Sequence, residues 1–469
     1  MRFLMLSSRA SWTGVPLSLL IAATAVIGCS PDAPSPVDPL SSGSRAAADA
    51  STMPTVTVGT SAELVAALSP ANAGARIHVR AGSYTVDRLL TVPDSAVLEG
   101  EGVMQFDGAG RPTGFAPGTG TTLTMTASVP GDVVTLGNGA TLRQLAIEDL
   151  AGRAGNAVGV VSRAPGDSVS ASIAEVEMFD PNPHGNSPLG PTGCGLAVVT
   201  RNPNLGGYPP PHEGATLDVR MVRSLIHAPA AGSCGLFAFN FAARGNVSVS
   251  VADNVIGGGI IANGGVSRTD AVHDASVRIE SRNTLYRQDF ADACADRRLG
   301  WNLTGGSGAP LPFVLPATEH NTLAIHSTDD RIEGFVTAVF AIGARRFFNA
   351  PIAGPNNGNG IELQMLHTTI STPSCGGVDL ELVGAASAGS YSPGDGNYVH
   401  ALLRGVTGSG TRANVYANTM GGSGALPDGV QGTGNRLEIT GNPRAFAETN
   451  TGIDPAPGAE FFTAASSRP

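Results

Sequence analysis

The chain contains no lysine, so all 28 of its basic residues are arginines. This absence excludes Schiff-base chemistry and a lysine general base, because both need a primary amine on a side chain. Charged residues of any kind make up only 14% of the 469 residues, and acids outnumber bases by 38 to 28. Nucleic-acid binding needs clustered cations along the phosphate backbone. With a formal net charge of −10, the chain is not expected to bind nucleic acid.

Aromatic residues are also scarce, at 5%, whereas glycine and proline are abundant, with 62 and 33 residues. This composition favours many short strands joined by turns over a bundle of helices. The sequence lacks G-x-S-x-G, P-loop and H-E-x-x-H motifs, its nine histidines show no ligand spacing, and no cysteine pair has C-x-x-C spacing. Recognisable nucleophile, nucleotide and zinc sites are therefore missing, and no cofactor is predicted from these motifs.

No apolar run reaches the length of about 20 residues that spans a bilayer. The run Val15–Ile27 (VPLSLLIAATAVI) follows Arg2 and Arg9 and is typical of the core of a signal peptide. It ends in V-I-G-C at Cys29, which resembles the lipobox of bacterial lipoproteins. The resemblance implies a lipid on Cys29, cleavage before it and export to the cell envelope, with Ser30 favouring the outer membrane or cell surface. An ordinary signal peptide with an incidental cysteine is the alternative.

The segment after this cysteine is rich in proline, serine, alanine and aspartate, a composition that favours a flexible tether. We predict a signal peptide over 1–28, a tether over 29–53, a folded body over 54–440 and a carboxy-terminal cap or tail over 441–469. Removal of residues 1–28 takes away two arginines and no acid, which leaves a net charge of −12. The membrane contact predicted for the protein is its lipid anchor alone.

One phrase recurs without gaps in the middle of the chain: Ala171–Met178 (ASIAEVEM), Val219–Ile226 (VRMVRSLI), Val249–Ile256 (VSVADNVI) and Leu363–Ile370 (LQMLHTTI). Its first, third and eighth positions are apolar, with alanine in one case, and its sixth is Val, Ser, Asn or Thr. The alternation predicts a half-buried strand, and the sixth position suits a bend into a second strand. Repetition at tens of residues predicts a solenoid, in which each unit buries its apolar face by stacking on its neighbours.

The start of the body has its own pattern. Thr55–Val58 reads as a strand, and Thr60 and Glu63 have the spacing of a capping box at the start of a short helix. The phrases R-I-H-V at 76–79 and V-L-E-G-E-G at 97–102 follow. This order resembles the amino-terminal cap and first coils of the pectin-lyase-like family. The resemblance implies an all-β fold: a single-stranded right-handed parallel β-helix, or solenoid, with a short amino-terminal capping helix.

Three asparagines, Asn254, Asn283 and Asn321, each precede a short apolar pair. In the family that the chain resembles, asparagines in such bends stack into hydrogen-bonded ladders. A simple Asx turn at each position is the alternative.

Four cysteines remain besides Cys29. Two of them begin matching phrases, C-G-L-A-V at Cys194 and C-G-L-F-A at Cys234. Equivalent strand starts in stacked coils lie about 4.8 Å apart, within the range that a disulfide allows. We therefore predict a Cys194–Cys234 disulfide, which leaves Cys294 to pair with Cys375. Four buried thiols are an equally open alternative.

Uniform coils leave function to the longer insertions. Residues 180–193 and 201–214 flank a short strand, and 287–302 holds paired arginines and a tryptophan. Stiff aromatic and polar groups suit sugar binding, and paired arginines suit the carboxylate of a uronate. The predicted substrate-binding residues are His184, Arg201, Tyr208, His212, Arg297, Arg298 and Trp301. Ordinary solvated loops are the alternative at each insertion.

Asp289, Asp292 and Asp296 would share a helical face and could gather Ca²⁺, although three lone carboxylates are few for this ion. The pair Asp329-Asp330 has the residue types of a glycosidase acid and base, but the phrases that accompany such a pair in the resembled family are missing, which favours a turn. No catalytic residue is assigned.

The sequence thus predicts an exported, lipid-anchored envelope protein that binds polysaccharide through loops on one face of a β-helix. A polysaccharide lyase or glycoside hydrolase of the same fold is one alternative, and a structural or adhesive surface protein is another. The fold alone does not choose between them.

Overall fold

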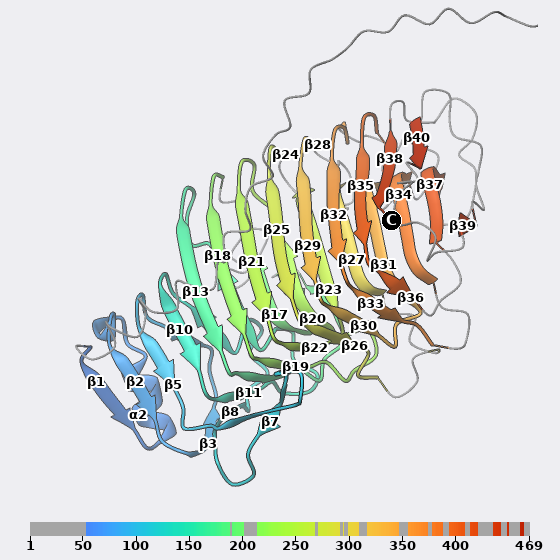
Figure 1. The fold of residues 1–469 in the computed structure, drawn as a ribbon. Coiled ribbons are helices and arrows are strands. Elements are labelled where there is room, and N and C mark those ends of the chain that lie inside the picture. The colour runs from blue at the N-terminus through green and yellow to red at the C-terminus, as the bar shows by residue number, and fades with distance from the viewer. Residues whose placement is uncertain are drawn as a thin grey trace, which may run out of the picture. The chain divides into compact units, whose positions relative to one another are not determined.

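In the computed structural model of the protein, the described residues are 53–187, 190–200, 213–267, 271–290, 294, 299–308, 317–346, 355–373, 378–387, 394–408, 413–420, 435–441, 448–449 and 460–463. They form almost entirely short strands, joined into three long parallel sheets (Figure 1). Across these ranges no helix combines the length and apolarity needed to cross a bilayer.

Each coil of the chain contributes strands to the three sheets in turn, and each strand pairs with its counterpart one coil along. Sheet 1 runs β1 (Thr55–Val58), β2 (Arg76–Val79), β5 (Val97–Glu99), β10 (Ala140–Arg143), β13 (Ser168–Ala174), β18 (Thr216–Val222), β21 (Asn246–Ala252), β25 (Ser276–Arg282), β29 (Thr322–Thr328), β32 (Gly360–Leu366), β35 (Tyr398–Arg404), β38 (Arg436–Gly441) and β40 (Glu460–Thr463). Sheet 2 runs β3 (Gly82–Val86), β8 (Thr121–Met125), β11 (Ala146–Glu148), β14 (Glu177–Phe179), β19 (Leu225–His227), β22 (Val255–Gly257), β26 (Leu285–Arg287), β30 (Arg331–Glu333), β33 (Thr369–Ser371) and β36 (Thr407–Gly408).

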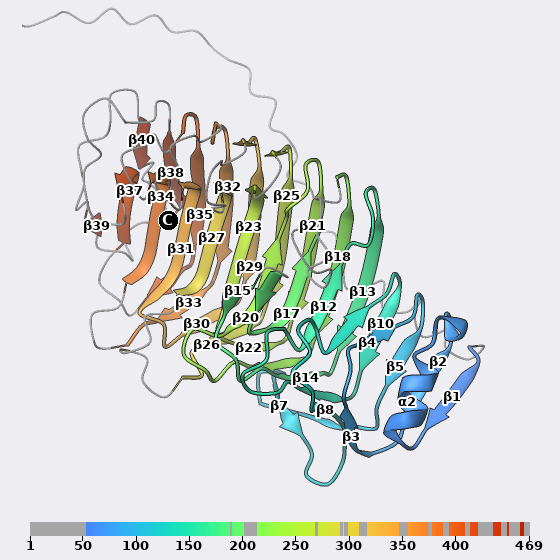
Figure 2. The same ribbon diagram turned by 180° about the vertical axis from the view of Figure 1, so that it is seen from behind.

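Sheet 3, seen from its own side in Figure 2, completes each coil. It runs β4 (Leu90–Val92), β9 (Val134–Leu136), β12 (Val158–Val161), β17 (Cys194–Val199), β20 (Cys234–Phe239), β23 (Ile260–Ser267), β27 (Leu299–Gly308), β31 (Thr337–Arg346), β34 (Val378–Ser387), β37 (Ala413–Met420) and β39 (Glu448–Thr449). Three short pairs lie outside the sheets: β15 (Gly185–Ser187) with β16 (Gly190–Thr192), β24 (Val272–His273) with β28 (Thr318–Glu319), and β6 (Met104–Phe106) with β7 (Pro112–Phe115). Three sheets of stacked parallel strands confirm the predicted parallel β-helix.

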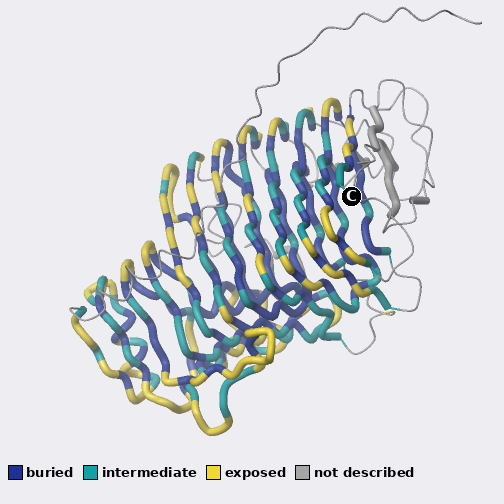
Figure 3. Tube along the Cα trace, in the orientation of Figure 1, coloured by how far each residue is buried: buried dark blue, intermediate teal, exposed yellow. Residues whose placement is uncertain are grey.

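The repeated phrase lies in register from coil to coil, as the sequence predicted. Ala171 pairs with Val219, which pairs with Val249, and their side chains point into the core. Alternate residues are buried and exposed along the strands, as Figure 3 shows. The change of direction is made at the fifth position of the phrase, where Arg223 and Asp253 have φ of 47° and 57°. At these short polar bends the chain passes from sheet 1 to sheet 2.

The predicted helix covers the start of the stack. α2 (Ser61–Ala67) begins after Thr60, whose Oγ1 accepts a hydrogen bond from Glu63 N over 3.2 Å. The Glu63 carboxylate in turn accepts from Gly59 N over 2.7 Å, one residue earlier than a standard capping box would have it. Leu64, fully buried, packs into the main core, so the helix covers apolar side chains at this end. A short 3₁₀ turn, Pro70–Asn72, follows.

A ladder of buried asparagines runs along one corner of the later coils. The backbone N–H of Asn321 donates to Asn359 Oδ1 over 3.1 Å, Asn359 N to Asn397 Oδ1 over 2.9 Å, and Asn397 N to Asn435 Oδ1 over 2.8 Å. All four side chains are fully buried. The ladder confirms the expectation for Asn321. It satisfies the backbone groups that the corner removes from the sheets.

The other two asparagines behave differently. Asn254 accepts from Ser224 N over 2.8 Å in a separate buried corner. Asn283 occupies a bend with φ of 47°, and its amide donates to Asp253 Oδ1 over 2.8 Å. It belongs to the exposed row of bends, not to a buried ladder.

The predicted Cys194–Cys234 disulfide is present. The two residues are register partners on β17 and β20, and their Cα atoms lie 4.6 Å apart. Cys294 is also disulfide-bonded, and Cys375, its predicted partner, lies outside the described residues.

Candidate functional site

A groove runs along the outward face of sheet 2 where the first coils meet the β6–β7 hairpin. Its floor is formed by outward side chains of three neighbouring strands: Glu148 on β11, Glu177 and Phe179 on β14, and His227 on β19. Register places Glu148 opposite Phe179 and Phe179 opposite His227, so these side chains form a row across the coils. The buried neighbours Ile147, Met178 and Ile226 anchor the same strands in the core.

The wall of the groove is the second arm of the hairpin and the chain that follows it, residues 113–120. Phe115 and Pro117 give this wall apolar surface, and Gly114 has φ of 123°, a value that favours glycine. A Cβ atom at Gly114 would lie 3.9 Å from Glu177 Oε1, in ordinary van der Waals contact, so the wall and this carboxylate are neighbours. The open groove has a volume of about 520 Å³, large enough for part of an extended ligand.

The polar groups of the floor are already oriented. His227 Nε2 lies 2.8 Å from Glu177 Oε1, and Thr124 Oγ1 donates to Glu148 Oε2 over 2.9 Å. Side chains held in this way lose less conformational entropy when a ligand arrives. These two contacts use one oxygen of each carboxylate, and the second oxygen is left as an acceptor for a ligand's donors.

Aromatic rings complete the surface. The Phe179 side chain is 38% exposed, high for a large apolar residue, and its ring centre lies 6.1 Å from that of His227 at an angle of 51°. Phe115 faces the same space from the wall. Exposed rings beside carboxylates suit a ligand with both apolar faces and polar edges.

The hairpin is fixed at its tip to a much later coil. Arg111 is 6% exposed, and its guanidinium donates to the carbonyl oxygen and to Oδ1 of Asn283 over 3.2 and 3.1 Å. Asn283 Nδ2 returns a hydrogen bond to Ala109 O over 3.2 Å. The turn is shaped by Asp107 Oδ1, which accepts from Ala109 N and Arg111 N over 2.8 and 2.9 Å. We call residues 104–120 the strap; its labelled strand β7 lies beside β8 and β19 in Figure 1.

A second group of titratable side chains lies on the outward face of sheet 1. Glu362, His400 and Glu438 follow one another across three strands, with His400 Nδ1 3.1 Å from Glu362 Oε1 and His400 Nε2 3.9 Å from Glu438 Oε2. The groove there is smaller, about 250 Å³. The ring of Tyr398 packs against that of His400 at an angle of 32°, with ring centres 4.5 Å apart. The groove beside the strap combines more space with the exposed ring of Phe179 and the half-buried ring of Phe115, and it is the stronger candidate.

Most of the sequence-predicted site lies outside the described residues. This applies to Arg201, Tyr208, His212, Arg297, Arg298, Asp292 and Asp296, and to Cys29. Asp289 is described, and its carboxylate contacts Arg287 Nε over 2.7 Å and Ala228 N over 3.3 Å. Its contacts are those of an internal ion pair.

The prediction that Trp301 contacts a ligand is wrong. The predicted insertion 287–302 ends earlier than expected, because β27 begins at Leu299. Trp301 pairs with Ile260 and Val339 in sheet 3 and is fully buried. Its ring meets Tyr286 edge-on at 5.2 Å, so Trp301 is a core residue.

His184 is half-buried against the disulfide. Its Nδ1 lies 3.1 Å from Thr192 O, 3.5 Å from Cys194 Sγ and 4.0 Å from Cys234 Sγ, and its ring packs on Phe237 at 5.5 Å. Burial lowers the pKa of His184, which favours the neutral ring. The three side chains together have the donor atoms of a metal site, but both sulfurs are committed to the disulfide.

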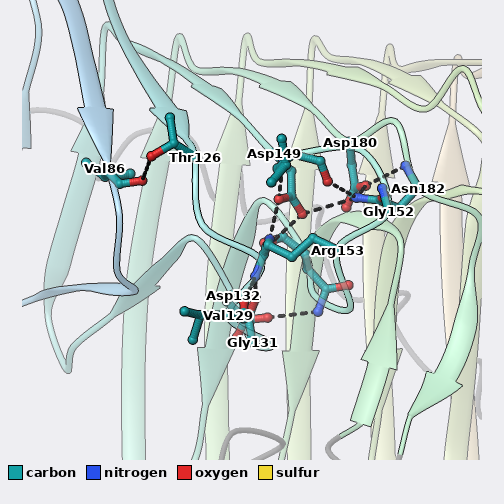
Figure 4. A network of polar contacts seen from close by, with 12 residues as sticks. Val86, Thr126, Val129, Gly131, Asp132, Asp149, Gly152, Arg153, Asp180 and Asn182 are labelled. Carbon is teal, nitrogen blue, oxygen red and sulfur yellow. Dashed lines mark hydrogen bonds and ion pairs between the residues drawn. The ribbon is translucent and has the colours of Figure 1, made fainter.

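Asp180, expected on a loop, is fully buried in a polar network (Figure 4). Arg153 donates from Nη2 to Asp149 Oδ2 over 2.7 Å, and Asn182 Nδ2 donates to Asp180 Oδ1 over 3.0 Å. Burial, with the nearby Asp149 charge, raises the pKa of Asp180 well above its ordinary value. Burial likewise raises the pKa of Asp149, against the opposing effect of Arg153. These groups lie inside the fold, so they are not a binding surface.

No protein family matches the chain in a comparison with family profiles, and no curated protein shows significant similarity. Among solved structures, the chain is similar to the catalytic unit of a thermostable GH87 α-1,3-glucanase from Streptomyces thermodiastaticus strain HF3-3. The TM-score is 0.31 with 14% sequence identity, over 89% of this chain and 71% of the glucanase. Similarity at this level carries no argument about activity, which has to come from the chemistry of the groove.

Proposed function

We propose that the protein binds polysaccharide at the bacterial cell surface and that the strap groove is its glycan-binding site. The observation that carries this proposal is the pairing of exposed Phe179 with the oriented Glu177 and His227 in one walled groove. A pyranose ring has apolar faces that pack on phenylalanine and hydroxyl edges that donate to carboxylates. Neighbouring strands of sheet 2 lie about 4.8 Å apart, and together they form a floor along which a chain of sugars could extend.

Hydrolysis is the second candidate function. Glu148 and Glu177 face the same groove from neighbouring coils, and a glycosidase needs two carboxylates, one as acid and one as base or nucleophile. Nothing in the described geometry fixes their roles. The same assay that detects binding therefore has to follow release of reducing and unsaturated ends.

The cellular location of the protein is part of the proposal. Lipidation at Cys29 and export to the outer membrane or cell surface rest on the signal-peptide pattern and on the disulfide, which suits an oxidising compartment. A Cys29→Ser variant should lose incorporated fatty acid and leave the membrane fraction. Retention of both would contradict the anchor and leave glycan binding untouched.

The decisive experiment is a binding titration of the purified full-length chain against a panel of polysaccharides, with product release followed in parallel. Phe179→Ala should weaken binding about tenfold or more, as expected when a stacking ring is lost. Glu177→Gln removes the carboxylate that orients His227 and should weaken binding similarly.

The matched control is Glu333→Gln, which removes one glutamate that also pairs with a basic neighbour on sheet 2 but outside the groove. Equal affinity for the wild type and both groove variants would overturn the assignment of this site. Product release that Glu177→Gln abolishes would establish the hydrolase instead.

A further inference from the structure

The charge of the groove is one-sided. Two carboxylates, Glu148 and Glu177, face it, and the only basic side chain among its described lining residues is His227. None of these lining residues is an arginine, and the chain contains no lysine. Even with His227 protonated and paired to Glu177, the Glu148 charge remains, so the groove is net negative in either state of the histidine.

The aromatic rings of the groove also favour a positively charged ligand. An aromatic ring attracts a cation that lies over its face, because the ring quadrupole is negative there. Phe115 and Phe179 both line the groove beside the carboxylates. A protonated amine could therefore meet a carboxylate on one side and a ring face on the other.

We propose that the glycan bound in the strap groove carries free amines, as a polymer of de-N-acetylated hexosamine does. This inference rests on the proposed glycan-binding function and names the ligand class. A protonated amine is only a hydrogen-bond donor, and an ionised carboxylate is only an acceptor. Protonated amines of the glycan could therefore donate to both Glu148 and Glu177. An acidic sugar would place like charges against Glu148 and Glu177.

The proposal reverses the charge class suggested by the sequence. Arg297 and Arg298 indicated a uronate, but they lie outside the described residues. The titratable side chains among the described groove residues are two carboxylates and one imidazole. Its outward carboxylates come from β11 and β14, whose positions the core fixes. The sign of the groove is thus a property of the scaffold and does not depend on any long insertion.

Three fluorescent hexamers of similar size test the idea on the full-length chain: hexaglucosamine, hexa-N-acetylglucosamine and hexagalacturonate. They are compared at a pH at which the free amines are protonated. We expect the amine hexamer to bind about tenfold or more tightly than the N-acetyl hexamer, and the uronate most weakly. Added salt should reduce the preference for the amine, since ionic contacts are screened.

The preference has to come from the groove rather than from the acidity of the whole protein. Glu148→Gln with Glu177→Gln should reduce amine binding about tenfold and abolish the preference over the N-acetyl hexamer. Asp87→Asn with Glu333→Gln changes the net charge equally at two sites outside the groove lining, and it should leave the preference intact. The single change Glu148→Gln, at an exposed side chain, serves if the double variant fails to fold.

The outcomes separate this inference from the proposed function. Equal or tighter binding of the uronate hexamer would overturn the amine class while glycan binding stands. Binding of hexalysine as strong as that of hexaglucosamine would also overturn it, because a basic peptide and not a sugar would then be recognised. Failure of hexaglucosamine to bind, with another polysaccharide of the panel still bound, would overturn the inference alone. Failure of every polysaccharide of the panel to bind would overturn the function on which it rests as well.

Discussion

Arg111 and Asn283 lie 172 residues apart in the sequence and are joined by two hydrogen bonds from one guanidinium. The contact fixes a hairpin that leaves the stack near its start to a bend several coils further along. The strap that forms the wall of the groove is thereby held by the coils at its base and by Asn283 at its tip. Arg111 is not one of the residues that line the groove, so it is a positioning residue for the site.

Removal of this contact is the first test. Arg111→Ala should destabilise the protein by about 1–3 kcal/mol, because Asn283 loses two partly buried hydrogen bonds from this guanidinium. It should also increase amide hydrogen exchange over the strap, measured by mass spectrometry, and weaken glycan binding. Arg88→Ala is the control, since Arg88 is exposed and contacts only the adjacent Asp87 in the pairs described. Faster exchange in the strap with unchanged affinity would show that the wall is dispensable for binding.

The buried carboxyl group of Asp330 should make the stability of the protein depend on pH. Burial raises the pKa of Asp330 to about 7, against hydrogen bonds from Thr284 N and Ser327 and the more distant Arg111 charge. Between an unfolded pKa near 3.8 and the folded value, the native state holds a proton that the unfolded chain has lost. Stability therefore falls as pH rises through this window, by about 4 kcal/mol in total, and this contribution is constant above it.

Chemical denaturation at pH 4.5, 6 and 8 measures this dependence. Asp330→Asn should flatten the profile, because the amide keeps an acceptor for Thr284 N and does not titrate. Asp329→Asn, at the neighbouring exposed bend, should leave the slope unchanged. A wild-type stability that rises over this range with no effect of Asp330→Asn would contradict the assignment.

The asparagine ladder should be costly to interrupt. Asn359 Oδ1 accepts from both Asn321 N and Asn321 Nδ2, and its own Nδ2 donates to Thr318 O over 2.8 Å. Asn359→Ala leaves these buried groups without partners and should lower the unfolding free energy in urea by about 2–4 kcal/mol. Asn246→Ala removes the acceptor of one exposed hydrogen bond from Ser276 Oγ and should have little effect. Equal losses for the two variants would mean that burial of the ladder is energetically unimportant.

Trp301 offers a test in which stability and binding separate. Trp301→Ala should cost about 3–5 kcal/mol through the cavity it leaves, with glycan affinity of the folded protein unchanged. Trp301→Phe should be far milder, since the indole Nε1 has no hydrogen-bond partner among the described residues. Stable Trp301→Ala protein with lost glycan affinity would restore the ligand role that the fold excludes.

The architecture was predictable because burial in the core requires apolar residues to recur at regular positions along each strand and from coil to coil. Ala171, Val219 and Val249 must all point inward, and this requirement sets both the strand and its register. The pairing of Cys194 with Cys234 follows from the same repetition. The bend was predicted one position too late, at Ser224, whereas the residue with positive φ is Arg223. Trp301 was misassigned because its strand follows an insertion, where no repeat marks the point at which the coil resumes.

The groove was not predictable, because its residues occupy outward positions on which core packing imposes no pattern. Glu177 occupies the seventh position of its phrase and Phe179 and His227 directly follow the eighth, all outward positions that packing leaves free to vary. Their alternation with buried residues was a signal that they face outward together. Which of the outward residues share a wall depends on the Arg111–Asn283 contact, and that contact has no signature in the sequence.

The asparagines of the ladder recur at one interval: each hydrogen bond joins residues 38 positions apart. Successive coils there have the same contour length, so addition or loss of a 38-residue segment would rejoin the ladder without a mismatch. The protein would become longer or shorter by one inter-strand spacing, about 4.8 Å, with the strap groove unaltered. Its reach is therefore adjustable in whole steps, independently of what its first coils recognise.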